Sequence, residues 1–186
     1  MTIAISTIDI GALSQQVIEA TLLLFRDDGS EIREALLPLI LSAEHDVVAL
    51  DFSHVQAIDF SCSDEIIVHV HENIALLQGK RIVLTNLSSN HKENIGSALD
   101  KKKQAVWVKE PEKAFILGDK LPKHLVELAT LLHQKGRATA RQLADEYEEE
   151  ITNFSVKLKK LYEHGLATRF EEKSSEGMQY VYATPI

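Results

Sequence analysis

The sequence contains a single cysteine, Cys62, in 186 residues. One thiol excludes an internal disulfide and a zinc site built from several cysteines. A predicted helix start nearby would favour a reactive thiolate, but we interpret Cys62 as a buried structural residue. No apolar run reaches the roughly 18 to 20 residues that span a bilayer, and Met1–Ile5 lacks the basic segment of a secretory signal peptide. We therefore expect a cytoplasmic protein that does not enter a membrane.

Motifs for catalysis or cofactor binding are also lacking. Gly11, Gly29 and Gly96 stand alone, and none is followed by the Gly-Lys-Ser/Thr sequence of a phosphate-binding loop. His69 and His71 are two residues apart, which on a helix places them on opposite sides, so they cannot share a metal ion. We expect no enzyme activity, no catalytic residue, no metal site and no cofactor.

Positive charge is scarce, and it is unevenly distributed. The net charge is −8, of which residues 1–118 carry −7 and residues 119–186 carry −1. Modules that bind nucleic acid usually have a basic excess. The acidic first part would repel DNA, so any DNA contact must come from local clustering of cations in the second part. We interpret the run Lys101–Lys103 as a solvated helix end, with a phosphate contact as the alternative.

Residues 1–110 alternate between strand-like and helix-like patterns. Strands are expected at residues 3–10, 46–52, 81–85 and 105–108, and helices after residue 30, after residue 63 and from residue 90. Residues 21–25 form either a strand or a buried helix. Asp28-Gly29-Ser30 is expected to form a turn, with Ser30 as a helix cap, and Ile74 is expected on the buried side of the helix after Ser63. This alternation predicts an α/β domain, followed by a linker at residues 109–121 with Pro111 and Gly118 in it and Pro122 at its end.

Residues 47–65 carry a resemblance to a known family. A strand that ends in Leu50-Asp-Phe-Ser53 is followed by a short apolar segment, an aspartate and a serine-rich helix start. This segment resembles the core of the STAS (anti-sigma-factor antagonist) superfamily. It is most similar to the STAS-like, DUF4325-type group, through Ser61-Cys-Ser-Asp-Glu65 and through Phe25-Arg-Asp-Asp-Gly29 upstream. The resemblance implies a mixed sheet with helices and a sensory or protein-interaction role.

The resemblance places a partner-contact surface at Asp59, Ser61, Ser63 and Asp64. In the phospho-regulated antagonists a serine directly follows the aspartate and accepts the phosphate, whereas here Phe60 follows Asp59. A serine near a helix start is more often an N-cap. We therefore predict no phosphorylation of Ser61 or Ser63, and we expect regulation by a bound partner or small molecule.

The pattern of residues 121–186 predicts three helices and a hairpin. The helices are expected at Lys123–His133, Ala138–Tyr147 and Ile151–His164, and the strands at Leu166–Phe170 and Gln179–Ala183, around a polar loop at residues 171–177. This order is typical of an α+β winged helix-turn-helix. Residues 158–169 are similar to the Leu-x-x-Leu-x-x-x-Gly-Leu-x-x-Arg end of MarR-like and ArsR-like winged helices.

The third of these helices is expected to be the recognition helix. Phe154, Leu158 and Leu161 recur at helical spacing and should face the core. Small polar side chains near the helix start would read base edges, and lysines beyond them would contact phosphates. The predicted DNA-contact residues are Thr152, Asn153, Ser155, Lys157 and Lys160 on this helix, Arg137, Thr139 and Arg141 near the start of the second helix, and Lys173 in the hairpin. Acidic residues oppose DNA binding at Glu148–Glu150 and, in the hairpin, at Glu171, Glu172 and Glu176.

The sequence therefore predicts a two-domain transcriptional regulator. Residues 1–110 would form the STAS-like domain that senses a partner or ligand, and residues 121–186 would bind DNA, with a homodimer on two half-sites. The alternative is a protein adaptor, in the manner of an anti-sigma-factor antagonist, in which both domains bind proteins. Around Lys157 and Lys160, a continuous positive surface would favour DNA, and a broken one would favour protein.

Overall fold

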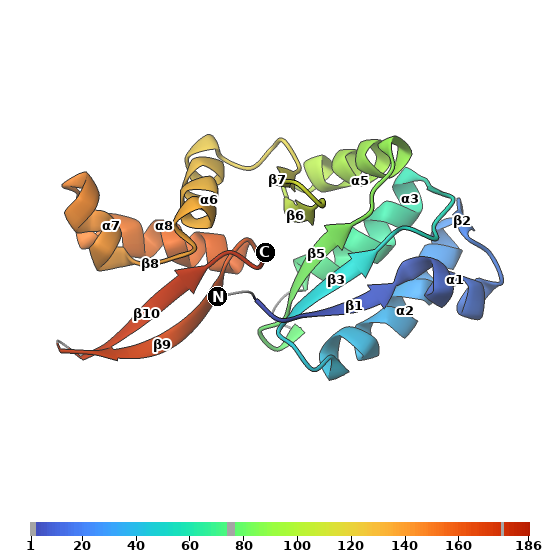
Figure 1. Cartoon of the computed structure of the whole chain (residues 1–186). Helices are drawn as coiled ribbons and strands as arrows, with labels where there is room; N and C mark the ends of the chain where they lie inside the picture. The colour runs from blue at the N-terminus through green and yellow to red at the C-terminus, as the bar shows by residue number, and fades with distance from the viewer. Residues whose placement is uncertain (1–2, 74–76, 176) are drawn as a thin grey trace. The chain divides into compact units, whose positions relative to one another are not determined.

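The structure is a computed structural model that describes residues 3–73, 77–175 and 177–186 (Figure 1). Contacts divide the chain into two compact units, which we call Unit 1 (Met1–Leu121) and Unit 2 (Pro122–Ile186). Every helix formed by the described residues is too short or too polar to cross a lipid bilayer.

Unit 1 is built on a five-stranded mixed sheet with the order β1-β3-β5-β6-β7. Its strands are β1 (Ile5–Asp9), β3 (Val47–Asp51), β5 (Arg81–Thr85), β6 (Val106–Lys109) and β7 (Ala114–Leu117). The first four pair in parallel, and β7 runs antiparallel to β6. A short parallel pair joins β2 (Leu22–Leu23) to β4 (Ala57–Ile58). Unit 1 is thus of the α/β class.

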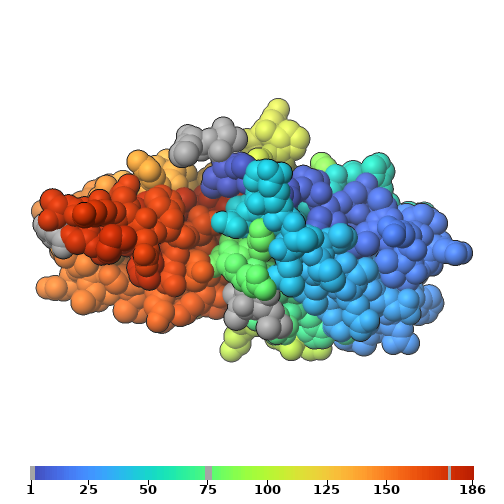
Figure 2. Space-filling model, turned by 90° about the horizontal axis from the view of Figure 1, so that it is seen from below, coloured from blue at the N-terminus to red at the C-terminus, as the bar shows by residue number. Residues whose placement is uncertain are grey.

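Helices of Unit 1 pack next to one another and share a core with the sheet. They are α1 (Ile10–Ile18), α2 (Arg26–Ser42), α3 (Phe60–Ser63), the π-helix η1 (Asp64–Val68), α4 (His69–Glu72) and α5 (Ser89–Lys101). α2 packs against α1, α3 and η1, and α5 packs against α3 and η1. Alternate residues of the central strands, such as Val48 and Leu50, lie in one core with Ile32 and Leu36 of α2. In the space-filling view, blue spheres from the beginning of Unit 1, which includes α1 and α2, cover much of the visible face of that unit (Figure 2).

The first strand is shorter than the sequence predicted, because a helix begins inside the expected range. β1 ends at Asp9, whose carboxylate accepts a hydrogen bond from the backbone N–H of Ala12 at 2.9 Å and caps α1. Helix α1 was not predicted from the sequence. Residues 21–25, left open between strand and helix, contribute the two-residue strand β2.

The predicted turn at Asp28-Gly29-Ser30 is wrong, since these residues lie inside α2. A Cβ atom on Gly29 would lie 3.0 Å from the Cα of Cys62 and 3.0 Å from the Cβ of Glu65. Glycine is therefore favoured here by the close approach of α2 to α3 and η1. The N-cap of α2 is Phe25, not Ser30.

The helix expected to start at Ser63 begins earlier, at Phe60. Its N-cap is Asp59, whose Oδ1 accepts the backbone N–H of Cys62 at 2.8 Å. The prediction that a serine caps this helix is thus wrong. Ile74, expected on the buried side of this helix, and Glu176 in the hairpin lie outside the described residues.

The segment expected to be a linker, residues 109–121, contains β7 and therefore contributes a strand to the sheet of Unit 1. Gly118 has a φ of +111°, and a Cβ atom there would clash with the carbonyl oxygen of Gln104. Gly118 thus marks a close contact inside Unit 1, whereas from the sequence it was expected to lie in a linker.

Unit 2 has the helices and the hairpin where the sequence predicted them. The helices are α6 (Lys123–Lys135), α7 (Ala140–Tyr147) and α8 (Ile151–Glu163), and the strands are β8 (Arg137–Thr139), β9 (Thr168–Ser174) and β10 (Gly177–Ala183). The strands form an antiparallel sheet with the order β8-β10-β9. Phe154, Leu158 and Leu161 are buried, as predicted. Strand β8 was not predicted, and most of the expected polar loop at residues 171–177 is strand.

Candidate nucleic-acid interface and a buried charge cluster

A groove of about 550 Å³ lies in Unit 2, where the first turns of α7 and α8 face the hairpin β9–β10. Three cationic side chains line it: Arg141 from α7, Lys159 from α8 and Arg169 from β9. The described residues of its lining include no carboxylate. The groove is therefore suited to an anionic ligand, although the net charge of the chain is negative.

The structure brings part of the predicted DNA-contact set into this groove. Thr139, Arg141 and Ser155 line it. Thr139 is buried and caps α7, because its hydroxyl accepts the N–H of Gln142 at 3.1 Å while the Gln142 side chain accepts the N–H of Thr139 at 2.9 Å. The role of Thr139 is thus first of all structural.

The remaining predicted contact residues lie outside the lining of the groove. Thr152, Asn153 and Lys160 are exposed on α8, Arg137 on β8 and Lys173 on β9. Arg137 lies in a shallow depression whose lining includes the acidic residues Asp145 and Glu146. Arg137 thus shares its depression with two carboxylates, which disfavour an anion there.

Lys157 is the predicted contact whose environment differs most from the expectation. Its side chain is only partly exposed, and its Nζ lies 3.3 Å from Oε2 of Glu149, in the acidic segment that precedes α8. The same ammonium lies 5.1 Å from the ring centroid of Phe154. The positive surface expected around Lys157 and Lys160 is therefore interrupted at Lys157.

Arg169 was not among the predicted contact residues. Its guanidinium carbon lies 4.1 Å from the ring centroid of Tyr162 on α8 and 4.5 Å from that of Tyr180 on β10. Arg169 belongs to the Gly-Leu-x-x-Arg pattern noted in the sequence. Its two tyrosine neighbours lie on a helix and on the other strand of the hairpin, however. They come close to Arg169 only through the packing of the helix and the strand register of the hairpin.

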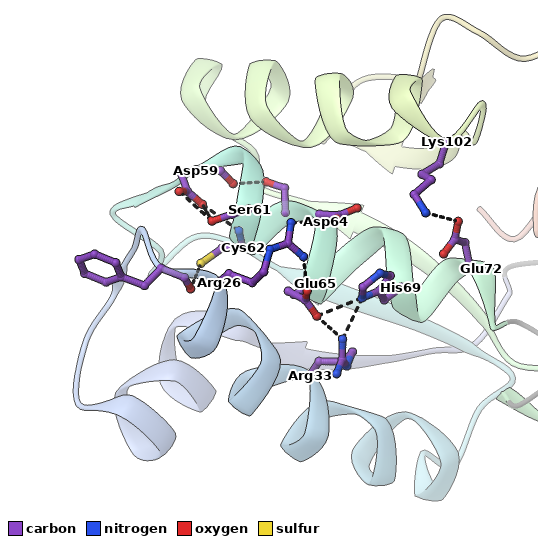
Figure 3. Close-up of polar contacts among 12 residues, drawn as sticks. Arg26, Arg33, Asp59, Ser61, Cys62, Asp64, Glu65, His69, Glu72 and Lys102 are labelled. Atoms are coloured by element: carbon purple, nitrogen blue, oxygen red, sulfur yellow. Dashed lines mark hydrogen bonds and ion pairs between the residues drawn. The ribbon is translucent and has the colours of Figure 1, made fainter.

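In Unit 1, the four residues expected at a partner-contact surface differ in exposure. Asp59 and Ser61 are partly exposed, whereas Ser63 and Asp64 are buried. The Ser61 hydroxyl donates to the Asp59 carboxylate, at 2.9 Å from Oδ1 and 3.0 Å from Oδ2 (Figure 3). The Ser63 hydroxyl donates to the backbone oxygen of Asp59 at 2.7 Å. Only Asp59 and Ser61 are therefore placed to meet a partner.

Asp64 and its neighbour Glu65 belong to a cluster of charges between α2 and η1 (Figure 3). Arg26 Nη2 lies 3.0 Å from Asp64 Oδ2, and the other terminal nitrogen of Arg26 contacts Glu65. Arg33 also contacts Glu65. The cluster joins the two segments that carry the resemblance to the STAS-like group, Phe25–Gly29 and Ser61–Glu65. Its two buried carboxylates are balanced by two guanidiniums from α2, which fits a role in holding α2 against η1.

Potential metal ligands also meet in this cluster, because one ligand atom each of Asp64, Glu65 and His69 lies within 4.8 Å of the others. From the sequence, His69 was considered as a metal ligand only together with His71, and this set of three residues was not predicted. Nη1 of Arg33 contacts Glu65 and lies 2.8 Å from Nδ1 of His69, so a guanidinium occupies the space between these groups. The geometry therefore fits an ion-pair network better than a cation site. Oδ1 of Asp64 is buried and makes no hydrogen bond within the described part of the chain.

The prediction that Cys62 is a buried structural residue is confirmed. Its side chain is fully buried, and its thiol donates to the backbone oxygen of Phe25 at 2.9 Å. Burial, and then the negative charges of Asp59 and Asp28, raise the pKa of the thiol to about 12. A thiolate nucleophile at this position is thereby disfavoured.

Comparison of the chain with protein-family models, with curated proteins and with solved structures gives no significant match.

Proposed function

We propose that the chain is a cytoplasmic transcriptional regulator in which Unit 2, as a winged helix-turn-helix, binds duplex DNA and Unit 1, as a STAS-like domain, receives the signal. The observation that carries this proposal is the groove that Arg141, Lys159 and Arg169 line and whose described lining residues include no carboxylate. The phosphate backbone supplies most of the affinity of a protein for DNA. A cluster of cations from three elements matches that ligand, and a homodimer would present two such clusters to two half-sites.

The exposed face of α8 supports its assignment as the recognition helix. Thr152, Asn153 and Ser155 are exposed in its first turns, while Phe154 anchors the helix in the core. Short polar side chains at the start of a helix that enters the major groove can reach base edges. Lys160, exposed further along the helix, is positioned to meet a phosphate.

The protein-adaptor alternative is favoured by a different observation. Ile151, Val156 and Met178 are 39%, 55% and 64% exposed, and Ile151 and Met178 line the same groove as the cations. Exposed apolar side chains next to one another often mark a protein interface. The ion pair of Lys157 with Glu149 also interrupts the positive surface, as expected for a protein-binding face.

Replacement of Lys160 by alanine tests the DNA-binding function. We expect Lys160→Ala to weaken binding of the full chain to duplexes of different sequence by a similar factor, because a phosphate contact carries no sequence information. The slope of log K against log salt concentration should fall by about one. Lys157→Ala should have a smaller effect, because Glu149 already balances the charge of Lys157. Fluorescence anisotropy with labelled duplexes over a salt series measures both quantities.

The matched control is Lys123→Ala, which removes one exposed lysine from α6, away from the lining of the groove. Its affinity and salt slope should equal those of the unmodified chain. If Lys160→Ala behaves like Lys123→Ala, the recognition-helix assignment is wrong. A full chain that binds no duplex at low salt would leave the adaptor function as the better account.

A further inference from the structure

We propose that the stack of Tyr162, Arg169 and Tyr180 is a preformed binding site for one backbone phosphate of duplex DNA, located at the base of the hairpin. The inference rests on the DNA-binding function proposed above. It adds a contact residue on β9 and predicts how the hairpin meets the DNA.

The geometry of the stack holds the guanidinium of Arg169 in place. Its central carbon lies 4.1 Å from the centroid of the Tyr162 ring and 4.5 Å from that of the Tyr180 ring. A cation over an aromatic ring is attracted by the negative face of the ring. Two such contacts from α8 and β10 restrict the rotamers of Arg169, so less conformational entropy remains to be lost when a ligand binds.

The charge of Arg169 is not neutralised within the described part of the chain. Among the described residues, no carboxylate lies within ion-pair distance of its guanidinium, in contrast to Arg26, Arg33 and Lys157. Stacking on an aromatic ring uses the faces of a guanidinium, so the N–H donors along its edges remain available for hydrogen bonds. The planar donor fork of arginine matches two oxygens of one phosphate.

The surroundings of Arg169 favour a phosphate of the DNA backbone. Arg141 and Lys159 line the same groove, and Nζ of Lys159 also lies 3.7 Å from Oε1 of Glu163. A row of cations from neighbouring elements suits a polyanion better than a single small anion.

The position of Arg169 also predicts which end of the hairpin approaches the DNA. Glu171 and Glu172 follow Arg169 along β9 towards the tip of the hairpin, and both are exposed. These carboxylates would be repelled by the phosphates that flank a minor groove. We therefore place the contact at the base of the hairpin, with its acidic part directed away from the minor groove.

The test measures the anisotropy of a fluorescein-labelled, random-sequence DNA duplex with the full chain over a salt series. We expect Arg169→Ala to weaken binding about tenfold and to reduce the salt slope by about one. Arg169→Lys should keep the slope and lose several-fold in affinity, because lysine keeps the charge but not the planar fork. Tyr180→Leu should lower the affinity without changing the slope, because Tyr180 positions the guanidinium and carries no charge.

Lys123→Ala is again the charge-matched control, and thermal melting by circular dichroism shows whether each variant is folded. If Arg169→Ala does not fold, Arg169→Lys provides the test. An affinity of Arg169→Lys for the duplex equal to that of the unmodified chain would then overturn the inference. An unmodified chain that binds the duplex, together with a folded Arg169→Ala of unchanged slope, overturns this inference alone. An unmodified chain that binds no duplex at low salt overturns the proposed function and this inference with it.

Discussion

The carboxylate of Asp59 stabilises the start of α3 through two hydrogen bonds. It accepts the backbone N–H of Cys62 and the hydroxyl of Ser61 at the same time. A phosphate on Ser61 would replace the hydroxyl donor with nearly two negative charges next to this carboxylate. The repulsion gives a physical reason for the prediction that Ser61 is not phosphorylated. Asp59 and Ser61 remain available as neutral or singly charged contacts for a partner.

Cys62 provides a test of burial at the scale of one side chain. Because the pKa of its thiol is raised to about 12, the thiol of the folded chain should stay protonated near pH 8 and react very slowly with an aromatic disulfide reagent. The same thiol should react rapidly once the chain is unfolded in guanidinium. The release of the coloured thiolate from the reagent measures both rates, and rapid reaction of the native chain would contradict the burial of Cys62.

The same shift makes the stability dependent on pH, with a defined sign. The folded-state pKa of Cys62 lies above the ordinary value of about 9, so the folded state binds the proton more tightly than the unfolded state. The resulting contribution to stability is complete below about pH 9 and is lost as the pH rises towards about 12. Guanidinium titrations of the native chain and of Cys62→Ala should therefore differ in slope against pH only above about pH 9.

At the scale of elements, Unit 2 was predictable because its helices carry their own stop and start signals. Gly136, with a φ of +79°, follows α6, and Gly165, with a φ of +73°, follows α8. The capping box of Thr139 and Gln142 starts α7. These signals are local in sequence, so they could be read without knowledge of the fold.

The errors in Unit 1 arose where a distant segment determines the local structure. Gly29 was interpreted as a turn residue, but it lies inside α2, where the close approach of α3 and η1 leaves little room for a side chain. The short apolar run of β7 lies between Pro111 and Gly118 and was therefore not recognised as a strand. It forms a strand by pairing with β6. The candidate sites show the same limit. Arg141 could be found from its place near a helix start, whereas the stack around Arg169 depends on the register of the hairpin.

Two glycines within helices, Gly29 and Gly96, provide a matched pair of substitutions that tests the close packing of α2. Gly29→Ala should lower the free energy of unfolding by about 1 to 2 kcal/mol, because its Cβ would lie 3.0 Å from backbone and Cβ atoms that cannot easily move. Gly96→Ala, in α5, should raise it by about 0.5 to 1 kcal/mol, because alanine favours the helix over glycine. The added Cβ of Gly96→Ala would meet only the end of the Leu117 side chain, at 3.4 Å.

Urea titrations of the two variants and of the unmodified chain measure the change in the free energy of unfolding. Opposite signs for the two substitutions are the expected outcome. A stabilising Gly29→Ala would show that α2 does not pack as closely on Cys62 and Glu65 as the structure has it.

At the scale of the whole molecule, the charge is divided between the units in a way that bears on DNA binding. Residues 1–118 carry a net charge of −7, while the near-neutral second part holds the groove lined by cations. In the proposed complex with DNA, Unit 1 would add no non-specific attraction, and the contacts of Unit 2 would have to supply the affinity. An acidic Unit 1 is better suited to receive a signal than to bind a polyanion.

The division into units also predicts where the chain can be cut. Fragments 1–121 and 122–186 should each show a cooperative melting transition by circular dichroism, because each unit is compact and has a core of its own. Fragment 1–110 should melt at a lower temperature than 1–121 or aggregate. It lacks β7, so β6 would become an unpaired edge and the core would lose Phe115 and Leu117, which pack against it. Equal melting of 1–110 and 1–121 would show that β7 is dispensable, and a fragment 122–186 that stays unfolded would show that the two units depend on a shared core.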